Sequence, residues 1–299
     1  HVNIYDNSTA TIASNSLKVV RSSSRTIVTI EKNFFFSGFA PIRSVDPHEY
    51  IIIRQNYIES IESTIWGNKP FYLIDAPAII VNNIIYASNP HPDQAEVSGF
   101  INDGGYVHFL NNLLILETNT SAPIHSATAL IAYVDAPTNV ISNNIIYYLN
   151  AGDPKNHGID NRSNKVLEEV SNNTFINLNE TWTFSPQGTN DFNDLTWLNS
   201  QSPLPPTYTF IGRDNTNITV INGIWEDISP SDIFMKNFKL AASSTFKDAG
   251  KTVDQNVYVR HDYTNSGVDF FGCTREDNIL TGSNFSIGPI EHASRATCP

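Results

Sequence analysis

Positive charge is scarce in this chain of 299 residues, which carries 18 Lys plus Arg against 30 Asp plus Glu. The formal net charge is −12. Nucleic acids and anionic membrane surfaces are bound through basic patches, so we expect neither as a partner. Divalent cations and neutral glycans remain compatible with this charge.

Long apolar runs are also missing. Hydrophobic residues make up 40% of the chain, but no run approaches the roughly 18 residues that a membrane helix needs. We therefore expect no membrane span. The chain starts at His1 and has a single methionine, Met235. These features favour a processed, exported protein that is secreted or located at the cell surface.

Cysteine is limited to Cys273 and Cys298, both close to the end of the chain. In an exported protein, two such cysteines are expected to form one disulfide, which here would pin the C-terminal tail. We favour this pairing over metal binding by two isolated thiols.

Paired polar amides inside β-prone apolar segments are the feature that this sequence has in abundance. Four clear copies are "IVNNIIYA", "FLNNLLIL", "VISNNIIYYLN" and "VSNNTFIN", and two looser copies, "IEKNFFFS" and "IRQNYIES", precede them. Aligned on the second amide, the copies give Asn33, Asn56, Asn83, Asn112, Asn144 and Asn173, with steps of 23, 27, 29, 32 and 29 residues. A recurrence of this length indicates a solenoid or a repeat array.

The segments around each repeated Asn are β-branched and aromatic and show no helical period, so each repeat is predicted to consist of strands. Short strands stacked coil on coil form a parallel β-helix, in which neighbouring strands lie about 4.8 Å apart. We expect the repeated Asn to occupy one corner of each coil in the left-handed backbone region. Its amide would then bind the Asn of the next coil, giving a satisfied asparagine ladder.

Two parts of the sequence carry a family resemblance: the V/I-x-N-N-x-I/F pattern over residues 30–177, and the segments "NFKLAASSTFKDAGKTVD", "VDFFGCTRE" and "SIGPIEH" near the C-terminus. The chain resembles the right-handed parallel β-helix proteins related to pectate lyases, many of which are exported. The C-terminal positions that match their closing pattern are Asp248, Gly250, Asp269, Gly272, Arg275, Gly288 and Glu291. The resemblance implies a right-handed β-helix finished by a closing segment, and enzymes and non-enzymes share it.

The sequence predicts a single domain. Residues 1–229 are predicted to form the β-helix, and residues 230–299 its closing segment. The stretch from about 179 to 214, rich in aromatics, Pro and Asn, is too long for an ordinary connection and is predicted to be an insertion or an irregular coil.

A column of aspartates precedes the ladder residues by eight to ten positions: Asp46, Asp75, Asp103 and Asp135. Coil stacking would bring these carboxylates together at one corner. One interpretation is an Asx-type turn that opens each strand. A second is a calcium site formed by Asp75, Asp103 and Asp135, because hard cations need clustered oxygens; calcium is the only cofactor that the sequence suggests. A third is a pair of acid/base carboxylates.

The segment "NHGIDN" (156–161) offers His157 and Asp160 as weak catalytic candidates. It is similar to the Gly-His-Gly segment of polygalacturonases, although Asn replaces the first Gly. We expect this segment to lie in a loop, where a solvated histidine is the alternative interpretation.

Three aromatic residues of the irregular stretch, Trp182, Trp197 and Tyr208, are candidates for stacking against sugar rings. The alternative is that they pack the irregular stretch onto the wall of the solenoid.

Two functions remain open. The first is an exported structural β-solenoid without catalysis, a subunit of an extracellular filament or surface layer, or an adhesin. Such a protein would associate head to tail or bind a surface glycan, and a missing cap at one end would favour it. The alternative is a polysaccharide lyase or glycoside hydrolase, including a tailspike-like depolymerase. That function requires a cleft with paired carboxylates, or with Arg or Lys beside a carboxylate.

Overall fold

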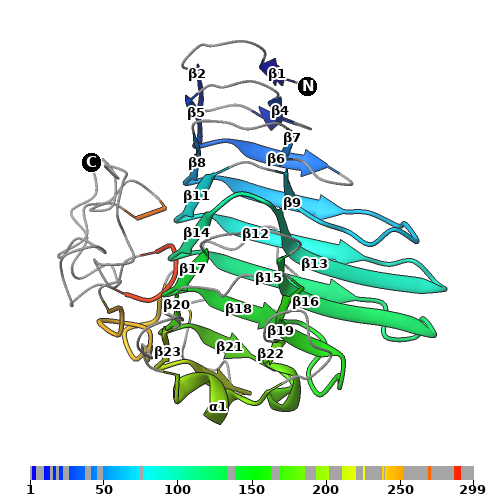
Figure 1. The fold of residues 1–299 in the computed structure, drawn as a ribbon, viewed down its shortest axis with the longest axis vertical. Helices are drawn as coiled ribbons and strands as arrows, with labels where there is room; N and C mark the ends of the chain where they lie inside the picture. The colour runs from blue at the N-terminus through cyan, green and yellow to red at the C-terminus, as the bar shows by residue number, and fades with distance from the viewer. Residues whose placement is uncertain are drawn as a thin grey trace.

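In the part of the chain that the structure describes, three parallel β-sheets of eight strands each are wound into a β-solenoid (Figure 1). The structure, a computed structural model, describes residues 2–4, 10–13, 16–17, 20–22, 27–37, 42–45, 50–74, 77–132, 139–162, 169–185, 193–201, 211–219, 225, 238, 240–251, 269–270 and 286–290.

Each sheet takes every third strand along the chain. Sheet A contains β1 (Val2–Ile4), β4 (Val20–Ser22), β7 (Ile42–Val45), β10 (Phe71–Ile74), β13 (Gln94–Asp103), β16 (Ile124–Ala132), β19 (Asn156–Asn161) and β22 (Phe184–Ser185). Sheet B contains β2 (Ala10–Ala13), β5 (Ile27–Glu31), β8 (Tyr50–Arg54), β11 (Ala78–Val81), β14 (Val107–Leu110), β17 (Asn139–Ser142), β20 (Glu169–Ser171) and β23 (Ile211–Arg213). Sheet C contains β3 (Ser16–Leu17), β6 (Phe34–Ser37), β9 (Tyr57–Ile61), β12 (Ile84–Asn89), β15 (Leu113–Thr118), β18 (Ile145–Tyr148), β21 (Thr174–Ile176) and β24 (Thr216–Ile218).

This arrangement confirms the predicted all-β parallel solenoid. The right-handed sense of the coil and the relation to pectate lyases stay predictions. Among the described residues, no helix has the length and hydropathy required of a membrane span.

The core consists of side chains that repeat in register from coil to coil. In sheet B, for example, Ile53, Ile80 and Phe109 occupy equivalent positions of successive strands, and each is at most 1% exposed. Period-two alternation directs such residues inward. Burial of each one contributes about 1.5–3 kcal/mol relative to an exposed side chain.

A ladder of asparagine side chains runs between the end of each strand of sheet B and the start of the following strand of sheet C. The backbone N–H and the Nδ2 of Asn83 both donate to Oδ1 of Asn112, at 2.9 and 3.0 Å, and Nδ2 also donates to the carbonyl of Ile53 at 2.9 Å. The same pattern links Asn33, Asn56, Asn83, Asn112, Asn144, Asn173 and Asn215. The predicted ladder is confirmed, and Asn215 is a member that the sequence analysis did not include.

The left-handed backbone position precedes the ladder residue. The φ angles of Asn82, Asn111, Asn143 and Asn172 are 56°, 51°, 58° and 50°, and Lys32, Gln55 and Asp214 are also left-handed. The expectation that one Asn serves both purposes is therefore wrong. The first amide of each pair turns the chain, which Asn tolerates better than most residues. The second amide joins the coils.

A short helix closes the end of the solenoid that lies opposite the N-terminus (Figure 1). Helix α1 (Leu195–Asn199) buries Leu198 against the core, and the ring of Trp197 stacks on Phe184 with centroids 5.5 Å apart. Strand β23 passes so close to α1 that position 212 requires glycine, because an added Cβ would lie 2.1 Å from the carbonyl oxygen of Leu198. The predicted irregular stretch at 179–214 thus contains two regular strands, β22 and β23, with α1 between them.

The edges of the last strands are hydrogen bonded by the residues that flank α1. Asn193 pairs with Phe184 of β22 through N–H···O bonds of 2.7 and 3.2 Å, and the carbonyl of Gln201 accepts from Gly212 of β23 at 3.0 Å. The ladder ends here as well, because Oδ1 of Asn199 accepts from both the backbone N–H and the Nδ2 of Asn215. At this end, the last described strands of sheets A and B and the last rung of the ladder therefore each have hydrogen-bonding partners.

We predict that the two amides of one pair differ in their effect on stability. Asn83→Ala should lower the free energy of unfolding by roughly 3 kcal/mol or more, because it leaves the buried N–H of Asn56 without its acceptor and removes the hydrogen bonds to Asn112 and to the carbonyl of Ile53. Asn82→Gly keeps the left-handed backbone available and should cost about 1 kcal/mol. Urea unfolding followed by circular dichroism would measure both variants, and equal losses would contradict the assignment.

Candidate functional site

The first amides of the pairs hold the C-terminal segment, defined here as the described residues 238, 240–251, 269–270 and 286–290, against the solenoid. Nδ2 of Asn143 donates to the carbonyl of Lys251 at 2.8 Å, and the N–H of Lys251 donates back to Oδ1 of Asn143 at 2.9 Å. Nδ2 of Asn172 donates to the carbonyl of Ala249 at 3.0 Å. Two earlier coils make equivalent contacts, from Gln55 to the carbonyl of Asp269 and from Asn111 to the carbonyls of Ser286 and Gly288.

An apolar contact accompanies these hydrogen bonds. The outer face of sheet C carries a row of hydrophobic side chains, among them Tyr86, Ile115 and Ile145, that are at most 4% exposed. Side chains of the chain's C-terminal part pack on this row: Trp225, Phe238, Leu240, Phe246, Ile287 and Ile290. The solenoid is therefore apolar on both faces of sheet C, inside toward the core and outside toward this layer.

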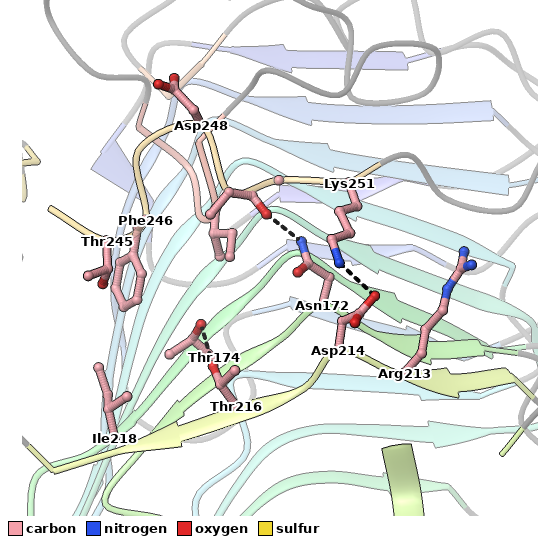
Figure 2. A pocket seen from close by; sticks show the side chains of 13 residues that line it. Asn172, Thr174, Arg213, Asp214, Thr216, Ile218, Thr245, Phe246, Asp248 and Lys251 are labelled. Atoms are coloured by element: carbon pink, nitrogen blue, oxygen red, sulfur yellow. Dashed lines mark hydrogen bonds and ion pairs between the residues drawn. The ribbon is translucent and has the colours of Figure 1, made fainter. Parts of the chain in front are cut away.

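A cleft of about 890 Å³ lies where the C-terminal segment meets the last coils (Figure 2). The strands β21 and β24 supply Thr174, Thr216 and Ile218, and the hydroxyl oxygens of the two threonines are 3.1 Å apart. The C-terminal segment adds Phe246 and Ile287, which are only 3% and 5% exposed. The cleft thus combines apolar surface with hydroxyl groups.

The charged residues of the cleft face carboxylates. Nζ of Lys251 lies 2.7 Å from Oδ2 of Asp214, and both side chains are about half exposed, at 56% and 46%. A guanidinium nitrogen of Arg213 lies 3.7 Å from Oε1 of Glu169, a carboxylate that is fully buried and accepts a hydrogen bond from the hydroxyl of Ser171. The cleft therefore presents two cations whose charges are each compensated by a carboxylate.

Sequence reasoning missed this cleft because its parts are distant in the chain. Arg213 and Asp214 precede ladder residue Asn215, which lies 42 residues after Asn173, outside the spacing of the earlier repeats. A signal was nevertheless present: Asp-Asn at 214–215 follows an apolar strand, as Lys-Asn and Gln-Asn do in the looser copies. Lys251 is brought to the site only by the fold of the C-terminal segment.

The catalytic candidates His157 and Asp160 lie elsewhere. They belong to strand β19 of sheet A, so the expectation that "NHGIDN" forms a loop is wrong. The imidazole of His157 stacks on Trp182 with ring centroids 4.3 Å apart, and Asp160 forms an ion pair with Arg162 at 2.6 Å. Burial lowers the pKa of His157 to about 4, against a smaller opposite effect of the carboxylates of Asp160 and Asp153.

The three aromatic candidates do not form one described platform. Trp182 is 38% exposed and contacts His157, whereas Trp197 packs on Phe184 at the closed end of the solenoid. Tyr208 lies outside the described residues. For Trp197, the described contacts fit the interpretation of packing onto the solenoid wall.

The predicted calcium site can be located only in part. Asp103 ends strand β13 in register with Ile74, while Asp46, Asp75 and Asp135 lie outside the described residues. Within the described ranges, no group of three or more His, Cys, Asp or Glu side chains could hold a metal ion. The calcium site stays a prediction.

The predicted disulfide also stays a prediction, since both Cys273 and Cys298 lie outside the described residues.

Compared with known proteins, the chain matches no family model, no curated protein and no solved structure.

His157 gives a pH prediction. Because its folded-state pKa of about 4 lies below the ordinary value of 6.5, the unfolded chain binds more protons between these two values. Stability should therefore fall as pH falls from about 6.5 to about 4, with a slope of up to about 1.4 kcal/mol per pH unit from this residue. Urea unfolding across this range should show a shallower loss in His157→Gln than in the wild type. Identical pH profiles would contradict the assignment.

Proposed function

We propose that the protein is an exported, non-catalytic β-solenoid of the adhesin type, which binds a polysaccharide in the cleft between sheet C and the C-terminal segment. The observation that carries this proposal is the composition of the cleft: the exposed hydroxyls of Thr216 and Thr245 and the partly exposed Ile218 lie beside two cations that are already paired with carboxylates. Ligand sites combine apolar surface with a few placed polar groups in this way.

Ile218 and Ala249 suit the faces of sugar rings. Both line the cleft and are partly exposed, so they offer surface to the C–H groups of a pyranose, whereas Phe246 and Ile287 are only 3% and 5% exposed. The exposed hydroxyl of Thr216 can both donate and accept hydrogen bonds, as sugar hydroxyls do. Thr216 and Ile218 lie two residues apart on β24 and so face the same side of the strand, which gives a short track along which an extended chain can lie.

The compensated charges favour hydroxyl recognition over recognition of a strong anion. For Arg213 to bind a ligand carboxylate, it would have to turn from Glu169, which is buried and would then lose its cation. Leaving a buried charge unpaired costs more than an exposed ion pair contributes. The net charge of −12 adds long-range repulsion of acidic polymers.

Among the structural functions, the closed end favours an adhesin over a head-to-tail filament. Strands β22 and β23 have hydrogen-bonding partners at Asn193 and Gln201, and Leu198 covers the core below them. A subunit that stacked on this end would first have to displace α1.

Catalysis on the bound polysaccharide is the second candidate. The cleft has a feature that this function requires: Lys251 stands beside the carboxylate of Asp214 (Figure 2). In a polysaccharide lyase, a basic residue removes the proton next to a uronate carboxyl group, and the pair of Lys251 and Asp214 is the candidate for that step.

We predict that the native protein is retarded in affinity gels that contain a neutral polysaccharide such as xylan, β-glucan or galactomannan. Thr216→Trp should abolish the retardation by filling the cleft, because Thr216 is exposed and its side chain can be enlarged without disturbing the core. Arg162→Ala, on sheet A, is the matched control and should bind as the wild type does. Equal binding by the wild type and Thr216→Trp would contradict the proposal, and so would no binding to any of these polymers.

A lyase assay separates the two candidates. The proposed binder leaves pectate and alginate unchanged, with no ultraviolet absorbance from unsaturated sugars. Absorbance that appears with the wild type and is lost in Lys251→Met would overturn the non-catalytic proposal and support the lyase.

A further inference from the structure

Exposed hydrophobic side chains are concentrated in one stretch of the chain, on two neighbouring strands of sheet C and the turn that follows them. Seven large hydrophobic side chains of the described residues are exposed, and five of them lie between residues 34 and 66. We call these five the aromatic patch: Phe34, Phe36, Ile61, Ile65 and Trp66. They belong to β6, to β9 and to the turn after β9. Within it, the ring of Phe34 stacks on those of Phe36 and Tyr57, and exposed apolar surface that gathers in this way marks an interaction site in many soluble proteins.

The aromatic patch continues a row that is covered elsewhere along the same sheet. Phe34 is in register with Tyr57, which is in register with Ile84. Tyr57 and Ile84 are 6% and 2% exposed and belong to the layer under the C-terminal part of the chain, whereas Phe34 is 48% exposed. The rings of Phe34 and Tyr57 stack with centroids 5.0 Å apart. The apolar row on the outer face of sheet C is therefore continuous: it is covered at Ile84 and Tyr57 and exposed at Phe34.

We propose that the aromatic patch is the contact surface of a homodimer, in which a second copy of this chain lies on β6 and β9 and extends the apolar layer that begins at Tyr57. A twofold axis through the patch makes the contact self-complementary, so each Phe34 and Phe36 packs on the partner copy. Two sheets that pack face to face in this way interdigitate their outward side chains about 10 Å apart.

A second copy fits this surface better than a charged partner does. The exposed groups of the patch are aromatic and aliphatic, and Phe36 stacks on Phe34 with centroids 5.7 Å apart. Glu59 is in register with Phe36. It adds a carboxylate beside the patch, and each chain carries a net charge of −12. An apolar contact between two acidic chains should become tighter as salt screens their repulsion. An interface made of ion pairs would weaken instead.

Sedimentation velocity of the wild type over a range of concentrations tests the proposal. We expect a monomer–dimer equilibrium whose Kd falls when sodium chloride is raised. Phe36→Glu should raise the Kd roughly tenfold or more, because it places a charge in the contact beside Glu59. Ile124→Glu is the matched control, since Ile124 is 52% exposed and lies on sheet A outside the patch. It should leave the Kd unchanged.

Quenching of Trp66 by acrylamide gives a second measurement that does not depend on the folding of Phe36→Glu. The contribution of Trp66, 75% exposed in the single chain, is obtained as the difference between the wild type and Trp66→Phe. It should become protected as the wild type dimerises. Three results would overturn the proposal: a wild type that stays monomeric up to roughly millimolar concentration, equal dimerisation of Phe36→Glu, or a dimer in which Trp66 remains equally accessible.

Discussion

The fold depends on the complete hydrogen bonding of side-chain amides buried between coils. Each ladder Asn from Asn56 to Asn173 accepts from the backbone and side chain of the preceding Asn and donates to the following one and to a carbonyl of the preceding coil, as Asn83 does. An amide buried without these partners would cost several kcal/mol. With these partners, the ladder amide fixes the register of one coil on the next. The connections at the other corners of the coils can then differ in length.

The pairing of amides gives the outside of the solenoid a second function. The left-handed turn at the first amide leaves its side chain outside the ladder, where Asn143 and Asn172 bind backbone groups of residues 249–251. The C-terminal segment thereby lies over sheet C and forms one wall of the cleft. The cleft is thus a consequence of the same repeated dipeptide that builds the coils, and Lys251 takes part both in the fastening and in the ion pair with Asp214.

The sequence predicted the solenoid and six members of the ladder because the repeat is local and periodic. It did not predict the seventh member, Asn215, or its final acceptor on α1, because an irregular coil intervenes. "NHGIDN" was expected in a loop but forms β19, where an added Cβ at 158 would come within 2.1 Å of the Thr183 carbonyl. The glycine there serves close strand packing. The cleft could not be predicted, because no local pattern reports which coil a distant tail will cover.

The claim that the two amides of one pair have separate functions is tested most directly by hydrogen exchange. It would be measured by mass spectrometry on the wild type, Asn143→Gly and Asn144→Ala. Asn143→Gly keeps the left-handed turn and removes the contacts to Lys251, so exchange should rise in residues 240–251 and stay unchanged in β14, β17 and β20. Asn144→Ala should raise exchange in those three strands. If both variants gave the same pattern, the two amides would not have separate functions and the account would be contradicted.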